Sequence, residues 1–331
     1  MLTRRQNMLE TIRGGNPDRF VNGHEALKLI RSSPDGKEFP RPVRGGDPVK
    51  NGWGVTIQYP ADAPGPFPVH DAEHIVLKDP SHWRDAVKAP ALNYTAEDWA
   101  DAAAECAAID RNEYFATMMV APGIFEQCHY LMSMVDAMVA FYEYPDEMHE
   151  LIDYITDFEL RYAEQVCRYV KPDCILHHDD WGSLTGSFLS PSMFEEFIVP
   201  AFTQIYGYYK SHGVELIVHH SDSYAANLVP DMIKMGIDVW QGPAGTNNVK
   251  DLIDRFGERI TFMGEVDNTV VDVAGWSDEI SYQQVRKICE KNGMHYFIPC
   301  ILGGTCYPGV SDSVLRAVCR YNTERFGICS R

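Results

Sequence analysis

From about residue 114 onward, apolar runs of strand length alternate with segments of helical periodicity. The runs lie in YFATMMVAP, DCILHHDD, ELIVHHSD, GIDVWQG, ITFMGEVD and HYFIPCILGG. Helices are expected from about Cys128, after Pro191, after Asp222, and from about Asn247, Ser277 and Ser311. This alternation is typical of parallel strands joined by crossover helices. The main body is therefore expected to be an α/β fold, either a closed barrel or an open doubly wound sheet.

Polar residues at the ends of the apolar runs help to choose between these two folds. They include Glu126 after the first run, residues 177–180 and 219–222, Glu265 and Cys300. Several strands that carry polar groups at their carboxyl ends are typical of a (β/α)8 TIM barrel, whose loops build one site at that face. An open sheet often carries a glycine-rich phosphate loop, and neither G-x-G-x-x-G nor a P-loop is present. We therefore expect a (β/α)8 TIM barrel.

The length and composition favour a single domain. A chain of 331 residues with 45% hydrophobic content can bury a large core, and barrels of this size commonly form one domain. Proline and glycine are frequent between residues 34 and 68, which predicts short strands and turns. We expect one domain over 1–331, with N-terminal helices and an elaborated β-arm or lid in 1–110 and the main barrel in 111–331.

Charge and hydropathy exclude several classes of partner. The formal net charge is -18, which argues against a surface for nucleic acid or for anionic membrane, because both need clustered Lys and Arg. The first 20 residues contain no apolar signal region, and no run approaches the roughly 18 apolar residues of a membrane span. A cytoplasmic enzyme is expected.

The nine cysteines contain no Cys-x-x-Cys pair, so each is most simply a small core residue unless its position singles it out.

The segment HHSDS, residues 219–223, contains the first candidate metal ligands. On a strand, His220 and Asp222 share one face, and this spacing lets both reach one ion. The alternative is that Asp222 caps the following helix. Cys300 ends the last apolar run and is either a buried thiol or a further ligand, because zinc accepts imidazole, thiolate and carboxylate together. Glu265 lies on the strand between them, as a ligand, a catalytic group or a carboxylate that orients His220.

The segment HHDDWG, residues 177–182, is the densest polar cluster in the chain. Its histidines and aspartates suit general acid/base catalysis, substrate contact or a second metal site, whereas the alternative is a solvated strand end that caps a turn. Asp179 and Asp180 point to opposite sides of a strand, so only one of them can face the lumen. We expect His178 and Asp180 to be catalytic and Glu126 to contact the substrate.

Aromatic residues near strand ends are the remaining candidates for substrate contact. Candidates for the wall of an apolar pocket are Trp53, Tyr59, Trp181, Tyr224 and Trp240, although packing in the core is the commoner fate of such residues. Nucleophilic catalysis has little support, because the chain lacks a G-x-S-x-G elbow and no cysteine lies in a protease-like context.

Two segments resemble the uroporphyrinogen decarboxylase superfamily. DDWGSLTGSFLSPSMFEEF is similar to the family's D-D-x-G, loop, S-P and helix, and HSDSYAANLVPDMIKMGIDVWQGP is similar to H-S-C-G-N followed by P-D-L-I-x-x-G-x-D. The resemblance covers roughly residues 114–325 and implies a (β/α)8 barrel. It also implies that Asp180 is the aspartate that faces the lumen.

The same resemblance implies one branch of the superfamily. The decarboxylases carry an arginine motif similar to R-Q-A-G-R that holds propionate groups, and DRFVNGHEALKLI lacks it. The other branch consists of zinc-dependent methyltransferases that work with a separate corrinoid (cobalamin) protein and use His-x-Cys and a later Cys as ligands. The alignment places His220, Asp222 and Cys300 at these positions. Carboxylate in place of thiolate makes the ion harder, which suits polarisation of an ether oxygen.

The resemblance therefore implies an O-demethylase methyltransferase. It would use Zn(2+) to transfer a methyl group from a methoxylated, aromatic substrate to the Co(I) of a corrinoid protein. The alternatives are a uroporphyrinogen decarboxylase-type decarboxylase and a methyltransferase between corrinoid and a thiol or tetrahydrofolate. A homodimer is an open alternative for the assembly.

Overall fold

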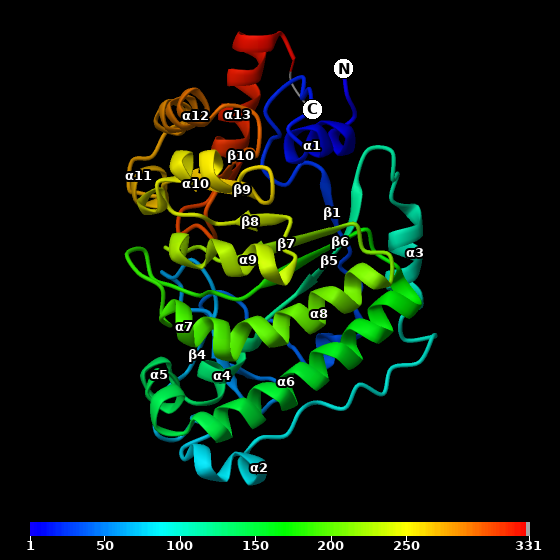
Figure 1. Ribbon diagram of the computed structural model, residues 1–331, viewed down its shortest axis with the longest axis vertical. Coiled ribbons are helices and arrows are strands. Elements are labelled where there is room, and N and C mark those ends of the chain that lie inside the picture. The colour runs from blue at the N-terminus through cyan, green and yellow to red at the C-terminus, as the bar shows by residue number, and fades with distance from the viewer. Residues whose placement is uncertain (329–331) are drawn as a thin grey trace.

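A curled parallel sheet forms the centre of the molecule in the computed structural model, which describes residues 1–328 (Figure 1). Seven strands pair side by side in the order β1-β5-β6-β7-β8-β9-β10. Their bounds are β1 Leu27–Leu29, β5 Phe115–Val120, β6 Cys174–His178, β7 Leu216–His220, β8 Val239–Gln241, β9 Thr261–Val266 and β10 Phe297–Ile301. The expected α/β alternation is confirmed as a TIM-like arrangement, and within residues 1–328 its main sheet contains seven strands where eight were predicted.

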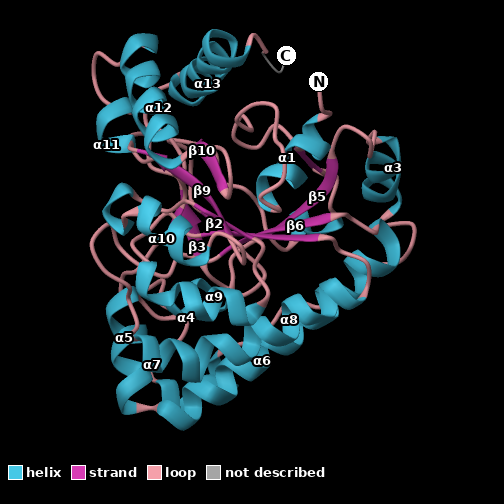
Figure 2. Cartoon of the chain, turned by 45° about the horizontal axis from the view of Figure 1, so that its top comes forward, coloured by secondary structure: helices cyan, strands magenta, loops and turns pink. Residues whose placement is uncertain are grey.

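Helices follow the strands and lie outside them (Figure 2). Their bounds are α1 Arg4–Ile12, α2 Trp83–Ala86, α3 Ala100–Ala108, α4 Ile124–Leu131, α5 Met134–Glu143, α6 Pro145–Gln165, α7 Pro191–Met193, α8 Val199–Ser211, α9 Val229–Met235, α10 Val249–Phe256, α11 Asn268–Val271, α12 Asp278–Asn292 and α13 Val310–Phe326. The cap of α12 is the Ser277 hydroxyl, which accepts a hydrogen bond from the backbone N–H of Ile280, as its sequence suggests. Across the described residues, no helix is both long enough and apolar enough to cross a membrane.

A second, smaller sheet lies in the region rich in proline and glycine. It is antiparallel and contains β2 Val49–Lys50, β3 Thr56–Gln58 and β4 Phe67–Pro68. The guanidinium of Arg44 joins this region to the loop after β10, because it donates hydrogen bonds to the backbone carbonyls of Thr305 and Cys306. The segment before β5 therefore reaches the carboxyl end of the last strand.

Alternating side chains of the strands divide the core into two parts. One set packs inside the curled sheet and includes Leu176, Val218, Val239, Met263 and Ile298. Their neighbours in sequence pack outward against the helices in a larger cluster. Because successive strand residues point to opposite faces, the positions two residues after the inner set are expected to face the lumen as well.

Of the nine cysteines, Cys329 lies outside the described residues.

Candidate metal and substrate site

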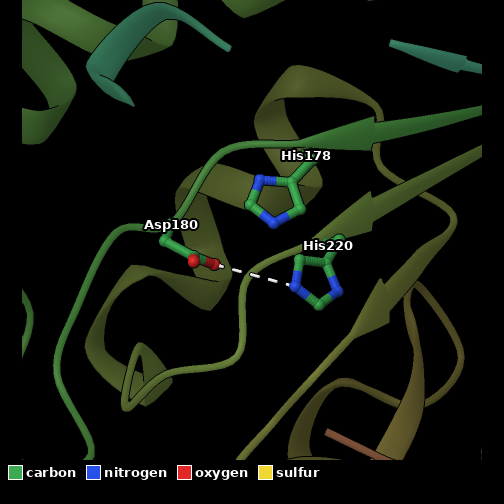
Figure 3. A group of neighbouring side chains, drawn as sticks. All are labelled: His178, Asp180 and His220. Carbon is green, nitrogen blue, oxygen red and sulfur yellow. Dashed lines mark ion pairs between the residues drawn. The ribbon is translucent and has the colours of Figure 1, made fainter. Parts of the chain in front are cut away.

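Three polar side chains meet at the carboxyl ends of β6 and β7 (Figure 3). One ligand atom from each of His178, Asp180 and His220 lies within 4.8 Å of the other two. The two histidines are register partners on neighbouring parallel strands, so both imidazoles leave the sheet at the same level. The Nε2 atom of His220 lies 3.9 Å from Oδ1 of Asp180, which comes from the loop directly after β6. Two imidazoles and one carboxylate form a donor set suited to a catalytic zinc ion, which leaves one position open.

A carboxylate fixes the orientation of His178. Its Nδ1 atom lies 2.8 Å from Oε2 of Glu126, a buried residue in the first turn of α4. Burial lowers the pKa of His178, but the negative charges of Glu126, Asp180 and Asp222 outweigh burial and raise this pKa to about 10. A carboxylate at Nδ1 leaves Nε2 as the atom that is available to a metal ion, and such carboxylate–imidazole pairs commonly support metal ligands.

An amide performs the same task for His220. The side-chain NH2 group of Gln241 donates hydrogen bonds to the backbone carbonyls of Ile301 and Leu302, at 3.2 and 2.8 Å. The amide oxygen therefore faces Nδ1 of His220 and accepts its hydrogen. Burial and the charge of His178 lower the pKa of His220 to about 4, so this imidazole is neutral at pH 7. A neutral imidazole with Nδ1–H engaged presents the lone pair of Nε2.

Asp222 lies beside this group and lines the same cavity. Its backbone N–H donates to Oδ1 of Asp180 at 3.0 Å. Burial and the nearby charge of Asp180 raise the pKa of Asp222 to about 7. The side chain expected as a zinc ligand is thus adjacent to the three-residue group, although it is not one of the three members. A carboxyl group with this pKa can hold a proton near neutral pH.

The cavity that contains these groups has a volume of about 1400 Å³. Its aromatic walls come mainly from the N-terminal region and from α4 and α6, and they comprise Phe39, Trp53, Tyr59, Phe67, Tyr130, Phe158, Tyr162 and Phe188. Glu126 also lines the cavity, where the sequence placed a substrate contact, and its carboxylate is already paired with His178. The volume exceeds the roughly 300–1000 Å³ of ordinary ligand pockets.

Of the five aromatic residues proposed from the sequence, Trp53 and Tyr59 line this cavity and the other three do not. Trp181 is buried, donates its Nε1–H to Asp179 and stacks on His219 with ring centroids 3.7 Å apart. Trp240 is fully buried and donates to the backbone carbonyl of Ser221. Tyr224 lies in the loop after β7, where its backbone N–H donates to the carbonyl of Ser183. The expectation that Trp181, Tyr224 and Trp240 wall the pocket is corrected, because Trp181 and Trp240 pack in the outer core cluster and Tyr224 is absent from the cavity wall.

Glu265 is also absent from the three-residue group. Alternation from Met263 would direct it into the lumen, but its backbone has φ of 67°, in the left-handed region. This conformation turns the carboxylate outward to the α12 residues Lys291 and Asn292, both of which donate to it. The expected role of Glu265 as a zinc ligand or catalytic group is therefore corrected to a contact between β9 and α12.

Cys300 faces the interior of the sheet but lies apart from the three-residue group. Its Sγ atom is 3.7 Å from Nδ1 of His24, a residue before β1 that lines the cavity. Burial raises the pKa of Cys300 to about 12, so the thiol stays protonated at pH 7 without a bound metal. Cys300, which was expected to be a zinc ligand, thus lies against His24. The group of candidate ligands in the structure consists of His178, Asp180 and His220.

Sequence reasoning missed Gln241, His24 and the aromatic walls other than Trp53 and Tyr59. Gln241 ends the strand in GIDVWQG just as His178 and His220 end theirs, so its position at the strand end was an available signal. His24 and the remaining aromatic residues carry no comparable signal, because only the folding of distant segments brings them to the cavity.

Comparison with known proteins adds family and fold. The model of the family described as Uroporphyrinogen decarboxylase (URO-D) matches residues 52–319. None of the curated proteins matches the sequence. A solved structure of a methyltransferase from Methanosarcina mazei is similar, with a TM-score of 0.63 and 13% sequence identity over 97% of this chain and 99% of that chain. At this identity the likeness concerns the fold. Because the family match spans well over half of the sequence, the chain belongs to the uroporphyrinogen decarboxylase (URO-D) family.

Proposed function

We propose that this protein is a zinc-dependent methyltransferase that moves a methyl group from a methoxylated aromatic substrate to the Co(I) of a separate corrinoid protein. The observation that carries the proposal is the convergence of His178, Asp180 and His220 in one large, largely apolar cavity. Both imidazoles have Nδ1 engaged, by Glu126 and Gln241, so that Nε2 is left for a metal ion. Preorientation of this kind is typical of metal ligands.

A similar solved structure and the side chains of the cavity support methyl transfer over decarboxylation of a porphyrinogen. That solved structure is of a methyltransferase. Among the described residues that line the cavity, the arginines are Arg31 and Arg41, and both are exposed. A substrate with several carboxylates needs a basic pocket. The cavity contains carboxylates instead, which include Asp180 and Asp222.

The donor set fits zinc, which would act as a Lewis acid on the ether oxygen when bound. The aromatic walls would hold the ring of the substrate and exclude water from the methyl group. When the C–O bond breaks, its electron pair stays on the phenolate oxygen, and the pair that forms the new Co–C bond comes from Co(I). Asp222, whose pKa is raised to about 7 by burial and by Asp180, would supply the proton that the phenolate takes up.

Metal analysis and a transfer assay test this proposal together. Purified wild type is expected to bind about one zinc ion per chain, and His178→Ala and His220→Ala are expected to lose it. Wild type with zinc and cob(I)alamin should convert aryl methyl ethers to phenols, with the methylcobalamin spectrum as the readout. His212→Ala, which changes the exposed histidine directly after α8, is the matched control. Zinc retained by both alanine variants would refute the assignment of ligands, and decarboxylation of uroporphyrinogen without methyl transfer would refute the function.

A further inference from the structure

A second group of polar residues, from the N-terminal region and α6, lines the same cavity. The hydroxyl of Tyr162 donates to Oδ2 of Asp35 at 2.8 Å, and the hydroxyl of Ser33 lies 3.3 Å from the Tyr162 oxygen. Glu159 lies one helical turn before Tyr162 on the same face of α6. All four residues line the cavity. We call Ser33, Asp35, Glu159 and Tyr162 the far subsite.

The far subsite has acceptor atoms that the protein does not use. Glu159 is 4% exposed, and its Oε2 atom has no hydrogen-bond partner among the described residues. Its other oxygen lies 3.5 Å from Nε2 of His177. Buried polar atoms almost always have a partner, so an unsatisfied carboxylate oxygen beside a cavity indicates a group that donates to it. The Tyr162 hydroxyl already donates to Asp35, which leaves Oδ1 of Asp35 as a further acceptor.

The chemistry of these atoms selects the kind of substituent that can bind. Two carboxylates repel an anion, and neither is paired with Lys or Arg in the described chain. Burial and the charge of Asp35 raise the pKa of Tyr162, so its hydroxyl stays protonated. The subsite therefore suits a neutral donor such as a phenolic hydroxyl. Aromatic rings lie beside it, with Phe158 5.0 Å from Trp53 and 6.4 Å from Phe39 between ring centroids.

We infer that the far subsite binds the hydroxyl-bearing end of an elongated aromatic methyl ether, so that the preferred methyl donors are phenolic and not carboxylated. This inference rests on the proposed function for the reaction at the site where His178, Asp180 and His220 meet. The volume of about 1400 Å³ leaves room for a donor of more than one ring.

Direct binding tests the subsite without any turnover. The probes are 4,4′-dihydroxybiphenyl, which is a demethylated product, 4-hydroxybiphenyl, and 4-hydroxybiphenyl that carries a carboxylate at the distal para position. Calorimetry on wild type should show tightest binding of the diphenol, by on the order of ten-fold over 4-hydroxybiphenyl, and weakest binding of the carboxylate. Equal binding of the first two, or tighter binding of the carboxylate, would overturn the inference.

Variants locate the effect. Asp35→Asn, Glu159→Gln and Tyr162→Phe should each reduce the preference for the diphenol several-fold. Asp157→Asn changes an exposed carboxylate on the other face of α6 and should leave the preference unchanged. Tyr162→Phe removes only the hydroxyl oxygen and keeps the ring, so this variant should fold. It therefore tests the subsite even if a carboxylate variant does not fold. An unchanged preference in folded Tyr162→Phe and Glu159→Gln would exclude the subsite.

The same probes separate this inference from the proposed function. Methyl transfer from 4-methoxybiphenyl and from 4-hydroxy-4′-methoxybiphenyl at equal kcat/KM would support the reaction and exclude the far subsite. Selective binding of the diphenol without methyl transfer from any ether would support the far subsite and exclude the reaction.

Discussion

The imidazoles of His178 and His220 lie nearly parallel, with ring centroids 4.4 Å apart and an angle of 24° between their planes. Adjacent parallel strands in register place them there, and Glu126 and Gln241 hold one nitrogen of each. Two stacked imidazoles can both be charged only at a high electrostatic cost. Burial, together with the charge of His178, therefore lowers the pKa of His220. A metal ion shared by the two Nε2 atoms would replace the proton of His178.

Glu126→Gln is expected to weaken metal binding by about 10- to 100-fold, because the carboxylate at Nδ1 makes His178 a better ligand and fixes its orientation. Titration with a competing chelator measures this affinity. Glu143→Gln, which changes an exposed residue at the end of α5, is the control and should bind zinc as wild type does. Wild-type affinity in Glu126→Gln would show that the pair has no part in metal binding.

Glu265→Gln is expected to retain zinc but to lose about 2 kcal/mol in the free energy of unfolding. The variant removes the negative charge of a carboxylate that pairs with Lys291 and accepts a hydrogen bond from Asn292. Because Lys291 can turn toward water, part of the lost stability is recovered. Urea unfolding and metal analysis on the same sample measure both quantities. Loss of zinc without a change in the free energy of unfolding would show that Glu265 is a zinc ligand.

Asp179→Ala is expected to destabilise the fold by about 3 kcal/mol. This fully buried carboxylate accepts from the backbone N–H groups of Phe125 and Glu126 and from Nε1 of Trp181, at 3.0, 2.7 and 2.8 Å. All three donors would lose their acceptor at a buried position. Ser190→Ala, which removes an exposed helix cap, should cost only about 1 kcal/mol by the same unfolding assay. Similar losses in the two variants would contradict the assigned importance of Asp179.

His129 is expected to make stability depend on pH. Burial and the charge of His70 lower the pKa of His129 to about 4, whereas an unfolded histidine has a pKa near 6.5. The unfolded chain therefore binds the extra proton as the pH falls from 6.5 toward 4, and the native state loses at most about 3 kcal/mol across this window. In His129→Leu this contribution disappears, so its stability should fall less than that of wild type between pH 7 and pH 5. Parallel pH profiles of the two proteins in urea unfolding would refute the assignment.

The strand alternation was sufficient to predict the parallel strands and a site at their carboxyl ends, but the ligands predicted beside His220 were Asp222, Glu265 and Cys300, whereas the group in the structure joins His220 to His178 and Asp180. It worked because the apolar runs and their register are local properties, and the carboxyl ends of parallel strands share one edge. The helix after the first strand also follows from periodicity, although it begins at Ile124 and not near Cys128.

The failures have two physical causes. The left-handed backbone at Glu265 reverses the direction of one side chain, and periodicity cannot reveal a single φ value. Trp181 and Trp240 are large enough to suggest a pocket wall, but burial against the outer helices satisfies them equally well. The polar far subsite depends on contacts between Asp35 and Tyr162, which are 127 positions apart in the chain.

The two edge strands of the curled sheet do not pair with each other within residues 1–328, and the gap between β1 and β10 is bridged by other contacts. The side chain of Asn322 in α13 exchanges two hydrogen bonds with the backbone of Phe20, at 3.0 and 2.8 Å. Asn22 donates to the carbonyl of Leu315 in the same helix. Contacts between the first 22 residues and α13 thus cover the gap between β1 and β10. Removal of either segment, as in trimming for crystallisation, would break these hydrogen bonds and expose the lumen between the two edge strands.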